Sequence, residues 1–408
     1  MRYLCAPDSF KESLTAAEAA RAMAEGIRRG DPGAEIRCLP MADGGEGTAR
    51  ALADATGGTM LTASAHDPLG RPVQAGFALL GDGRTAVVET AAASGLALLR
   101  PSERDPKATT SYGTGELIRA ALDAGAETII VGLGGSATND AGCGLLQALG
   151  VRLLDHDGRD VRPGGAALAE VERVDLSGLD RRLGDVHVIA ACDVTNPLTG
   201  PEGASAVFGP QKGASREDVT LLDGALRHVS SVIERALAEQ VPAERNGDGG
   251  KVEAAVAESS SPDHRTRTPI ADHPGAGAAG GIGMALLAVL HADFRPGIDL
   301  VIEQSGLDAA AQWADIVFTG EGSIDAQTMF GKTPVGVASV AKRHGKPVIA
   351  IAGHVGDGIE CLHGRGIDAV FGAAPGAASL DELLRDARAN VARTAEQVTR
   401  LMRIVCSH

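Results

Sequence analysis

Residues 128–150 constrain the fold of this chain more than any other stretch. They read TIIVGLGGSATNDAGCGLLQALG, and the opening β-branched run is typical of a buried strand. Glycines and polar residues then break the pattern, and the apolar spacing from Ala141 onward indicates a helix. A glycine-rich loop between a strand and a helix can cradle a phosphate group, because backbone N–H groups and the helix start face the anion. An ordinary turn with Asn139 or Asp140 as the helix cap explains the same residues equally well.

Strand and helix patterns alternate at both ends of the chain, and this alternation predicts a parallel sheet. Strands are expected over 2–6 and 36–40, each followed by a polar loop with an acid and then by a helix. Thr15 and Glu18 form a capping-box pattern at the start of the first helix. The alternation returns in the last third, with strands expected over 316–318, 347–352 and 369–371.

The middle of the chain has a different organisation. Short strand-like runs over 59–90 are separated by turn signals, as in an antiparallel meander. We therefore predict an α/β protein with a discontinuous Rossmann/flavodoxin-like parallel-sheet domain, residues 1–60 and 295–408, and an inserted α/β domain with a mixed sheet, residues 61–294. Polar composition without apolar periodicity predicts a mobile loop over 241–269.

The amino-acid composition limits the classes of partner that this protein is expected to bind. A formal net charge of −15 and an aromatic content of 2% argue against nucleic acid and against an anionic membrane surface. The longest apolar run, 275–290, is too short and too broken to span a bilayer. Six scattered cysteines and the absence of a signal-peptide pattern indicate a cytoplasmic protein with free thiols. The oligomeric state stays open, a homo-oligomer included.

Several loops combine glycine with a carboxylate or a lysine. These loops are residues 8–11, 43–47, 132–140, 193–198, 209–213, 275–281 and 321–332. The sequence contains no His/Cys zinc pattern, no GxSxG motif and no GxxxxGK[ST] motif. Anion-binding loops together with unpaired acids suit phosphoryl transfer, which needs phosphate cradles, Mg²⁺ ligands and a carboxylate that accepts a hydroxyl proton.

Two other functions fit parts of the pattern. Gly132, Gly134 and Ala137 match the looser GxGxxG/A dinucleotide fingerprint, and Asp155 lies where a ribose-binding acid is expected, which would suit an NAD(P)-dependent oxidoreductase acting on a small hydroxy acid. However, Asp155 begins the sequence DHDG, which favours a hairpin turn. A non-catalytic metabolite-binding protein would use the same loops without a metal or a base.

The motifs occur in an order that resembles one known family. They are APDSFKESLTA (6–16), ADGGEGT (42–48), TTSYGTGELI (109–118), GGSATNDAG (134–142), ACDVTNPL (191–198), FGPQKGAS (208–215), PGAGAAGG (274–281) and TGEGSID (319–325). Together they resemble the bacterial glycerate kinase family, glycerate 2-kinase-like and of type I, nearly end to end. The resemblance implies a two-domain α/β enzyme that phosphorylates D-glycerate with MgATP, usually at the 2-hydroxyl and otherwise at the 3-hydroxyl. The polar segment near 244–272 departs from the family, whose members generally pass quickly from the preceding helix to PGAGAAGG.

Within that pattern we assign roles from residue chemistry. The candidate general base for the glycerate hydroxyl is Asp193, with Asp8 and Asp325 as the alternatives. The candidates for binding ATP phosphates are Lys212, Gly134, Gly135, Ser136, Thr138, Gly277 and Gly280. The candidates for binding glycerate are Lys11 and Arg104, which suit its carboxylate, with Ser9 and Asn196. The candidate Mg²⁺ ligands are Glu321 and Asp325, with Asp43 and Glu46 as rivals.

Overall fold

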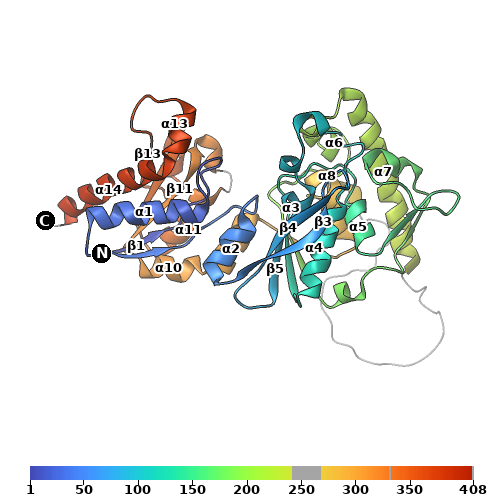
Figure 1. The fold of residues 1–408 in the computed structure, drawn as a ribbon, viewed down its shortest axis with the longest axis horizontal. Coiled ribbons are helices and arrows are strands. Elements are labelled where there is room, and N and C mark those ends of the chain that lie inside the picture. The colour runs from blue at the N-terminus through green and yellow to red at the C-terminus, as the bar shows by residue number, and fades with distance from the viewer. Residues whose placement is uncertain (241–267, 330–331, 407–408) are drawn as a thin grey trace.

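The computed structural model describes residues 1–240, 268–329 and 332–406, and its longer strands form two sheets (Figure 1). The loop predicted over 241–269 lies outside the described residues, apart from its last two positions. Within the described ranges, no helix combines the length and the apolar composition needed to cross a membrane.

The first sheet is parallel throughout, in the order β13-β12-β11-β1-β2. Its strands are β1 (Arg2–Cys5), β2 (Glu35–Cys38), β11 (Ile316–Ile324), β12 (Val348–Val355) and β13 (Ala369–Gly372). Counted along the chain within this sheet, the order is 2-1-3-4-5, which is the flavodoxin-like arrangement. The predicted parallel sheet built from both ends of the chain is therefore confirmed. Ligands of such sheets bind at the switch point, which here lies between β1 and β11.

Helices cover both faces of the first sheet. On one face, α1 (Ala16–Gly30) and α14 (Ala387–Cys406) lie side by side and bury Tyr3, Cys5 and Phe318 (Figure 1). The capping box of Thr15 and Glu18 begins α1 as predicted. The helices of the other face and of the sheet ends are α10 (Leu307–Trp313), α11 (Thr333–Arg343), α12 (Glu360–His363) and α13 (Leu380–Arg385).

The second sheet is mixed, as predicted, in the order β10-β9-β6-β5-β4-β3. Its strands are β3 (Thr59–His66), β4 (Pro72–Leu79), β5 (Thr85–Glu89), β6 (Thr128–Gly132), β9 (His187–Ala191) and β10 (Asp293–Arg295). The meander of β3, β4 and β5 is antiparallel, whereas β5, β6, β9 and β10 run parallel. A separate antiparallel pair joins β7 (Arg152–Leu154) and β8 (Arg173–Asp175).

One apolar cluster joins the two sheets. It contains Val87 and Ile130 of the second sheet, Leu4 and Val317 of the first sheet, and residues of α2 (Thr48–Thr56) and α9 (Gly297–Ser305). In Figure 1, α2 lies between the two halves of the molecule. The opposite face of the second sheet is covered by helices that include α3 (Thr90–Ser94), α4 (Tyr112–Asp123), α5 (Cys143–Ala148), α6 (Ala204–Phe208), α7 (Arg216–Gln240) and α8 (Ala278–Ala288). The loops at the ends of both sheets are therefore held against a shared core.

Two glycine-rich segments differ from the helices expected there. The helix expected from Ala141 begins at Cys143, because Ala141 and Gly142 both have left-handed backbone angles, with φ of 55° and 69°. In α8 the three residues 279–281 are also left-handed, so the regular helical turns begin only after them. The strand expected over 316–318 is longer, because β11 keeps its parallel pairing with β12 as far as Ile324.

Candidate active site

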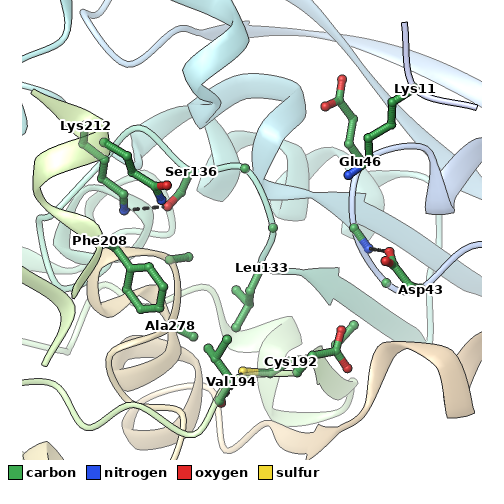
Figure 2. Close-up of a pocket in the computed structure, with 18 residues that line it drawn as sticks. Lys11, Asp43, Glu46, Leu133, Ser136, Cys192, Val194, Phe208, Lys212 and Ala278 are labelled. Carbon is green, nitrogen blue, oxygen red and sulfur yellow. Dashed lines mark hydrogen bonds between the residues drawn. The ribbon is translucent and has the colours of Figure 1, made fainter. Parts of the chain in front are cut away.

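A pocket of about 370 Å³ lies where the carboxyl ends of parallel strands from both sheets meet (Figure 2). The loops after β1 and β2 contribute Lys11 and residues 43–46, and the loops after β6 and β9 contribute residues 133–136 and 191–194. The lining is completed by Phe208, Gln211, Lys212, Ala278 and Ala279. Parallel sheets bind ligands at this end of their strands, so the pocket is the candidate active site.

Glycines allow the loops of the two sheets to approach each other closely. Gly44 has a φ of 93°, and a Cβ atom built on it would lie 2.6 Å from the Cα of Gly297. A Cβ atom on Gly134 would lie 3.3 Å from the Cα of Gly45. A side chain at Gly44 would push the loop after β2 away from Gly297, and one at Gly134 would push the loop after β6 away from Gly45. Either change would alter the shape of the pocket.

One side of the pocket is formed by Gly134, Gly135, Ser136 and Lys212, which we call the lysine cluster. Lys212 is 2% exposed, and its Nζ donates to Ser136 Oγ at 2.8 Å and to the Thr138 carbonyl at 2.7 Å (Figure 2). These contacts use two of the three N–H groups of the ammonium. Burial lowers the pKa of Lys212 to about 7, and the charge of Asp140 opposes that shift. An anion in the pocket would favour the protonated lysine.

Asp140 holds the loop that presents this cluster. Its buried carboxylate accepts from the backbone and hydroxyl of Ser111, at 2.8 and 2.9 Å, and from the N–H groups of Gly142 and Gly144, both at 3.2 Å. The Ser111 hydroxyl oxygen also accepts from Leu145 N at 3.0 Å. The expectation that the start of the following helix offers free donors to a phosphate is therefore wrong, because Asp140 and Ser111 already bind those N–H groups.

Three carboxylates from the first sheet form what we call the acidic cluster: Asp8, Asp43 and Glu321. Asp8 follows β1 and Glu321 lies in β11, so both flank the switch point of the sheet. Burial raises the pKa of Asp8 to about 6, and the charge of Asp43 adds to the shift. Burial raises the pKa of Glu321 to about 7, with Lys332 opposing and the other two acids adding to it. The negative charges of these carboxylates thus disfavour one another's ionised forms.

Neutral and cationic groups support the acidic cluster. The Thr333 hydroxyl donates to Asp8 at 2.5 Å, and the Thr328 hydroxyl donates to Glu321 at 2.9 Å. The Lys332 ammonium lies 3.7 Å from Glu321, whose side chain is 13% exposed. Asp43 lines the pocket directly, and its Oδ1 accepts from Gly45 N at 3.1 Å (Figure 2).

Asp193 follows β9 and lines the same pocket. Its Oδ1 accepts from Gly297 N at 2.9 Å, at the first residue of α9. Burial of the carboxylate and the charges of Asp43 and Asp299 raise its pKa. The Asp193 carboxylate therefore binds the backbone and also lines the pocket. Its two oxygens can accept several hydrogen bonds, so it can keep the contact with Gly297 N and still accept one from a ligand.

The remaining predicted residues fall into two groups. Lys11 and Glu46 line the pocket and are exposed. The others are absent from the pocket lining of the described chain: Asp8, Ser9, Arg104, Thr138, Asn196, Gly277, Gly280, Glu321 and Asp325.

Several of these nine have local contacts that define their position. Ser9 N donates to Asp8, and Asn196 Nδ2 donates to the Glu202 carbonyl at 2.8 Å. Asp325 Oδ1 accepts from Gln327 N at 2.8 Å, in the turn that begins the 3₁₀ helix over 326–329.

Two further residues have buried polar atoms without a hydrogen-bond partner in the described chain, namely Arg104 Nε and Thr138 Oγ1. Gly277 and Gly280 are packed against backbone, since a Cβ on Gly280 would lie 1.9 Å from the Thr138 carbonyl. The PGAGAAGG loop instead reaches the pocket through Ala278 and Ala279.

Sequence reasoning missed the apolar part of the lining. Leu133, Val194 and Phe208 line the pocket together with Cys192 and Gln211 (Figure 2). Phe208 opens the FGPQKGAS motif, and its aromatic ring is rare in a chain with 2% aromatic residues. That rarity is the signal that could have identified it.

Asp155, the acid required by the dinucleotide fingerprint, lies in the predicted hairpin turn. Its Oδ1 accepts from the N–H groups of Asp157 and Arg159, both at 2.9 Å. This carboxylate serves its own turn after β7, and the structure gives no support to its use as a ribose ligand.

An α/β protein whose strand ends bring acids and a lysine-bearing glycine loop to one pocket has the architecture of a phosphotransferase. The model of the Glycerate kinase family matches residues 3–403. A glycerate kinase of Bacillus subtilis (strain 168) is 48% identical over 98% of this chain and 97% of its own length. The glycerate 2-kinase of Escherichia coli (strain K12) is 45% identical over 99% and 98%.

A solved structure agrees with these relatives. The crystal structure of a protein provisionally assigned as glycerate kinase 2 of Salmonella typhimurium LT2 aligns with a TM-score of 0.83 at 46% identity, over 99% of this chain and 98% of that one. The chain belongs to the glycerate kinase family, and the resemblance inferred from its motifs is confirmed.

Proposed function

We propose that the protein transfers the γ-phosphoryl group of ATP to a hydroxyl group of D-glycerate. The observation that supports this most is one pocket lined both by the lysine cluster and by Asp43 of the acidic cluster, whose other two members lie outside the lining. Phosphoryl transfer depends on positioning and on neutralising charge, and these two clusters supply groups of both signs. D-glycerate is proposed as the substrate because the relatives are named glycerate kinases. The name of the Escherichia coli relative, glycerate 2-kinase, favours transfer to the 2-hydroxyl.

The lysine cluster is the proposed binding site for the ATP phosphates. Lys212 has an N–H group left for a phosphate oxygen, and Gly134 and Gly135 allow close approach of the backbone. The apolar surface of Phe208, Leu133 and Val194 is the proposed contact for the adenine ring. The nucleotide would then lie mainly against the loops of the second sheet.

The acidic cluster is the proposed Mg²⁺ site. Hard oxygen ligands and mutual repulsion of the carboxylates fit a divalent cation, and bound Mg²⁺ would neutralise charge on the transferred phosphoryl group. Asp43 is the member that lines the pocket, so it is the first candidate ligand, and the exposed Glu46 beside it remains a rival. Asp325 is the weakest candidate, because its carboxylate serves a turn.

Glycerate is proposed to lie between the two clusters. Lys11 lines the pocket and would pair with the glycerate carboxylate, whereas Ser9, Arg104 and Asn196 would need to move to reach it. Asp193 is proposed to accept the proton of the attacking hydroxyl, since it lines the pocket and its pKa is raised.

We also propose two domains with the boundaries expected from the sequence, residues 1–60 with 295–408, and residues 61–294. Sheet membership supports this division, although α2 and α9 pack against both sheets. The free cysteines support a cytoplasmic location.

The activity is tested by supplying MgATP and D-glycerate and measuring ADP. We expect glycerate-dependent ADP formation, and phosphorus NMR of the product is expected to identify 2-phosphoglycerate. Absence of glycerate-dependent ADP would contradict the proposal, and oxidation of NADH by hydroxypyruvate would favour an oxidoreductase instead.

A further inference from the structure

Two cysteines lie opposite each other at the carboxyl ends of β1 and β2. Cys5 and Cys38 are register partners in this parallel pair, so their side chains leave the same face of the sheet. Neighbouring strands lie about 4.8 Å apart. Disulfides join residues whose Cα atoms are about 4.4–6.8 Å apart, so a bond between these two cysteines requires only a local adjustment of the strand ends.

The two thiols differ in accessibility and in acidity. Cys38 is exposed on the edge strand of the sheet, whereas Cys5 is fully buried beneath α1. The interaction with the neighbouring Cys5 thiol and the charges of Arg28 and Arg21 lower the pKa of Cys38, whose Sγ donates to the Ala20 carbonyl at 3.5 Å. The interaction with Cys38 together with burial raises the pKa of Cys5. An exposed thiol with thiolate character beside a second, shielded thiol is the usual arrangement of a redox-sensitive pair.

This cysteine pair lies next to the loops of the acidic cluster. Cys5 is three residues before Asp8, and Cys38 is five residues before Asp43. Beyond the strands, Leu39 N donates to the Cys5 carbonyl at 2.8 Å and Met41 N donates to the Pro7 carbonyl at 2.9 Å. The two loops are therefore tied together as they leave the sheet, and a change in spacing at Cys5 and Cys38 is transmitted to both.

We propose that Cys5 and Cys38 are a redox modification site that forms a reversible disulfide with peroxide as the oxidant, and that this bond lowers the activity. A disulfide brings the two Cβ atoms to about 3.8 Å, which draws the strand ends together and shifts the loops that carry Asp8 and Asp43. The effect on activity rests on the proposed kinase function, whereas formation of the bond does not.

The chemistry proceeds in two balanced steps. The Cys38 thiolate attacks one oxygen of hydrogen peroxide, the O–O bond breaks, hydroxide leaves, and a sulfenic acid forms on Cys38. The Cys5 sulfur then attacks the Cys38 sulfur, and the S–S bond forms. The hydroxyl group of the sulfenic acid leaves with the Cys5 proton as water. A dithiol reductant reverses the overall change by thiol–disulfide exchange.

The test uses the full-length protein, reduced, freed of reductant and treated with graded hydrogen peroxide. Free thiols are then alkylated and the protein is digested with trypsin, which releases Cys5 in residues 3–11 and Cys38 in residues 38–50. We expect these two peptides to appear joined and to separate after dithiothreitol. In parallel, the glycerate-dependent rate is expected to fall several-fold and to recover with the reductant.

Matched variants separate this pair from other thiols. Cys38→Ser is expected to keep its activity in peroxide, whereas Cys361→Ser, which removes an exposed thiol elsewhere, is expected to lose activity as the wild type does. Cys5→Ala provides a second variant that cannot form the bond. The proposal is overturned if the joined peptides are absent in the wild type, or if Cys38→Ser is inactivated as strongly as the wild type. If the reduced protein lacks kinase activity, the proposed function fails, and the joined peptides still decide whether the site exists.

Discussion

The acidic cluster and the lysine cluster both contain groups whose charged forms are disfavoured, but for different reasons. Burial and like charges from neighbouring strand ends raise the pKa values of Asp8 and Glu321. Burial alone is the main cause that lowers the pKa of Lys212, which is held by neutral acceptors. A bound cation would stabilise the ionised carboxylates of the acidic cluster, and a bound anion would stabilise the protonated form of Lys212. A metal–nucleotide complex carries a cation and an anion together. The complex is therefore suited to a pocket that has the acidic cluster near one side and the lysine cluster on the other.

The largest expected effect concerns Asp193, which belongs to neither cluster. Asp193→Asn keeps an oxygen that can accept from Gly297 N but loses the ability to take a proton. If Asp193 is the base, kcat falls by about 10² to 10⁴-fold while the KM for glycerate changes little. Steady-state kinetics and a melting curve measure this directly.

Other roles for Asp193 give other results. A wild-type kcat in Asp193→Asn would remove it from the mechanism, and Asp8 would become the candidate base. Partial rescue by raised Mg²⁺ would instead assign Asp193 to the metal and extend the acidic cluster to the second sheet.

Removal of the buried lysine tests the lysine cluster. Lys212→Met keeps the volume of the side chain and removes the charge, so we expect kcat/KM for ATP to fall by about 10² to 10³-fold. Lys107→Met is the matched control, because Lys107 pairs with Asp105 and Asp218 outside the pocket lining. Equal losses in the two variants would contradict a specific role for Lys212.

The acidic cluster is tested by Mg²⁺ affinity and its dependence on pH. Glu321→Gln is expected to weaken Mg²⁺ about 10- to 100-fold, whereas Asp325→Asn is expected to leave it unchanged, because Asp325 serves a turn. Titration calorimetry with MgCl₂ measures both variants.

The sign of the pH dependence follows from the raised pKa values, about 6 for Asp8 and about 7 for Glu321. Below these values the folded protein holds protons on the cluster, and Mg²⁺ must displace them. Mg²⁺ affinity in the wild type should therefore fall as pH decreases through about 7 to 6, with proton release on binding. A Mg²⁺ affinity that does not change between pH 8 and pH 5.5 would show that other groups bind the metal.

The smallest expected effect concerns the apolar lining. Phe208→Ala should raise the KM for ATP by roughly 2- to 10-fold, the equivalent of about 0.5–1.5 kcal/mol for an aromatic stack, with kcat nearly unchanged. Val207→Ala, at the exposed neighbouring position, should have no effect. A larger change in the KM for glycerate than for ATP would mean that Phe208 contacts the acceptor.

Local sequence patterns predicted much of the fold and several residues of the pocket. The alternation of strands and helices predicted the parallel sheet. The predicted loops that combine glycine with a carboxylate or a lysine contribute Lys11, Asp43, Ser136 and Asp193 to the pocket. Lys212 was found because it lies between glycines in a motif, although its anchor, Ser136, is 76 residues away. Such a long-range contact depends on how the segment between α6 and α7 packs against the loop after β6, and it has no signature in local sequence.

The same reasoning could not separate residues that share a motif. Glu321 and Asp325 look equivalent in TGEGSID, yet β11 continues through Glu321 and ends at Ile324, so only Glu321 faces the other acids. In PGAGAAGG the glycines suggested a ligand loop, but left-handed backbone at residues 279–281 packs Gly280 against Thr138 and turns the alanines to the pocket. Strand length and backbone handedness are set by tertiary pairing, which a single sequence does not contain.

The division of roles between the two clusters is tested most directly by titration calorimetry of ATP with and without Mg²⁺, on the wild type, Lys212→Met and Asp43→Asn. Asp43→Asn keeps the acceptor for Gly45 N, so the loop after β2 should keep its shape. We predict that Lys212→Met binds metal-free ATP at least about tenfold more weakly than the wild type, a loss of about 1.4 kcal/mol. Asp43→Asn should bind metal-free ATP as tightly as the wild type and lose only the gain from Mg²⁺. A loss of metal-free ATP binding in Asp43→Asn equal to that in Lys212→Met would contradict the division.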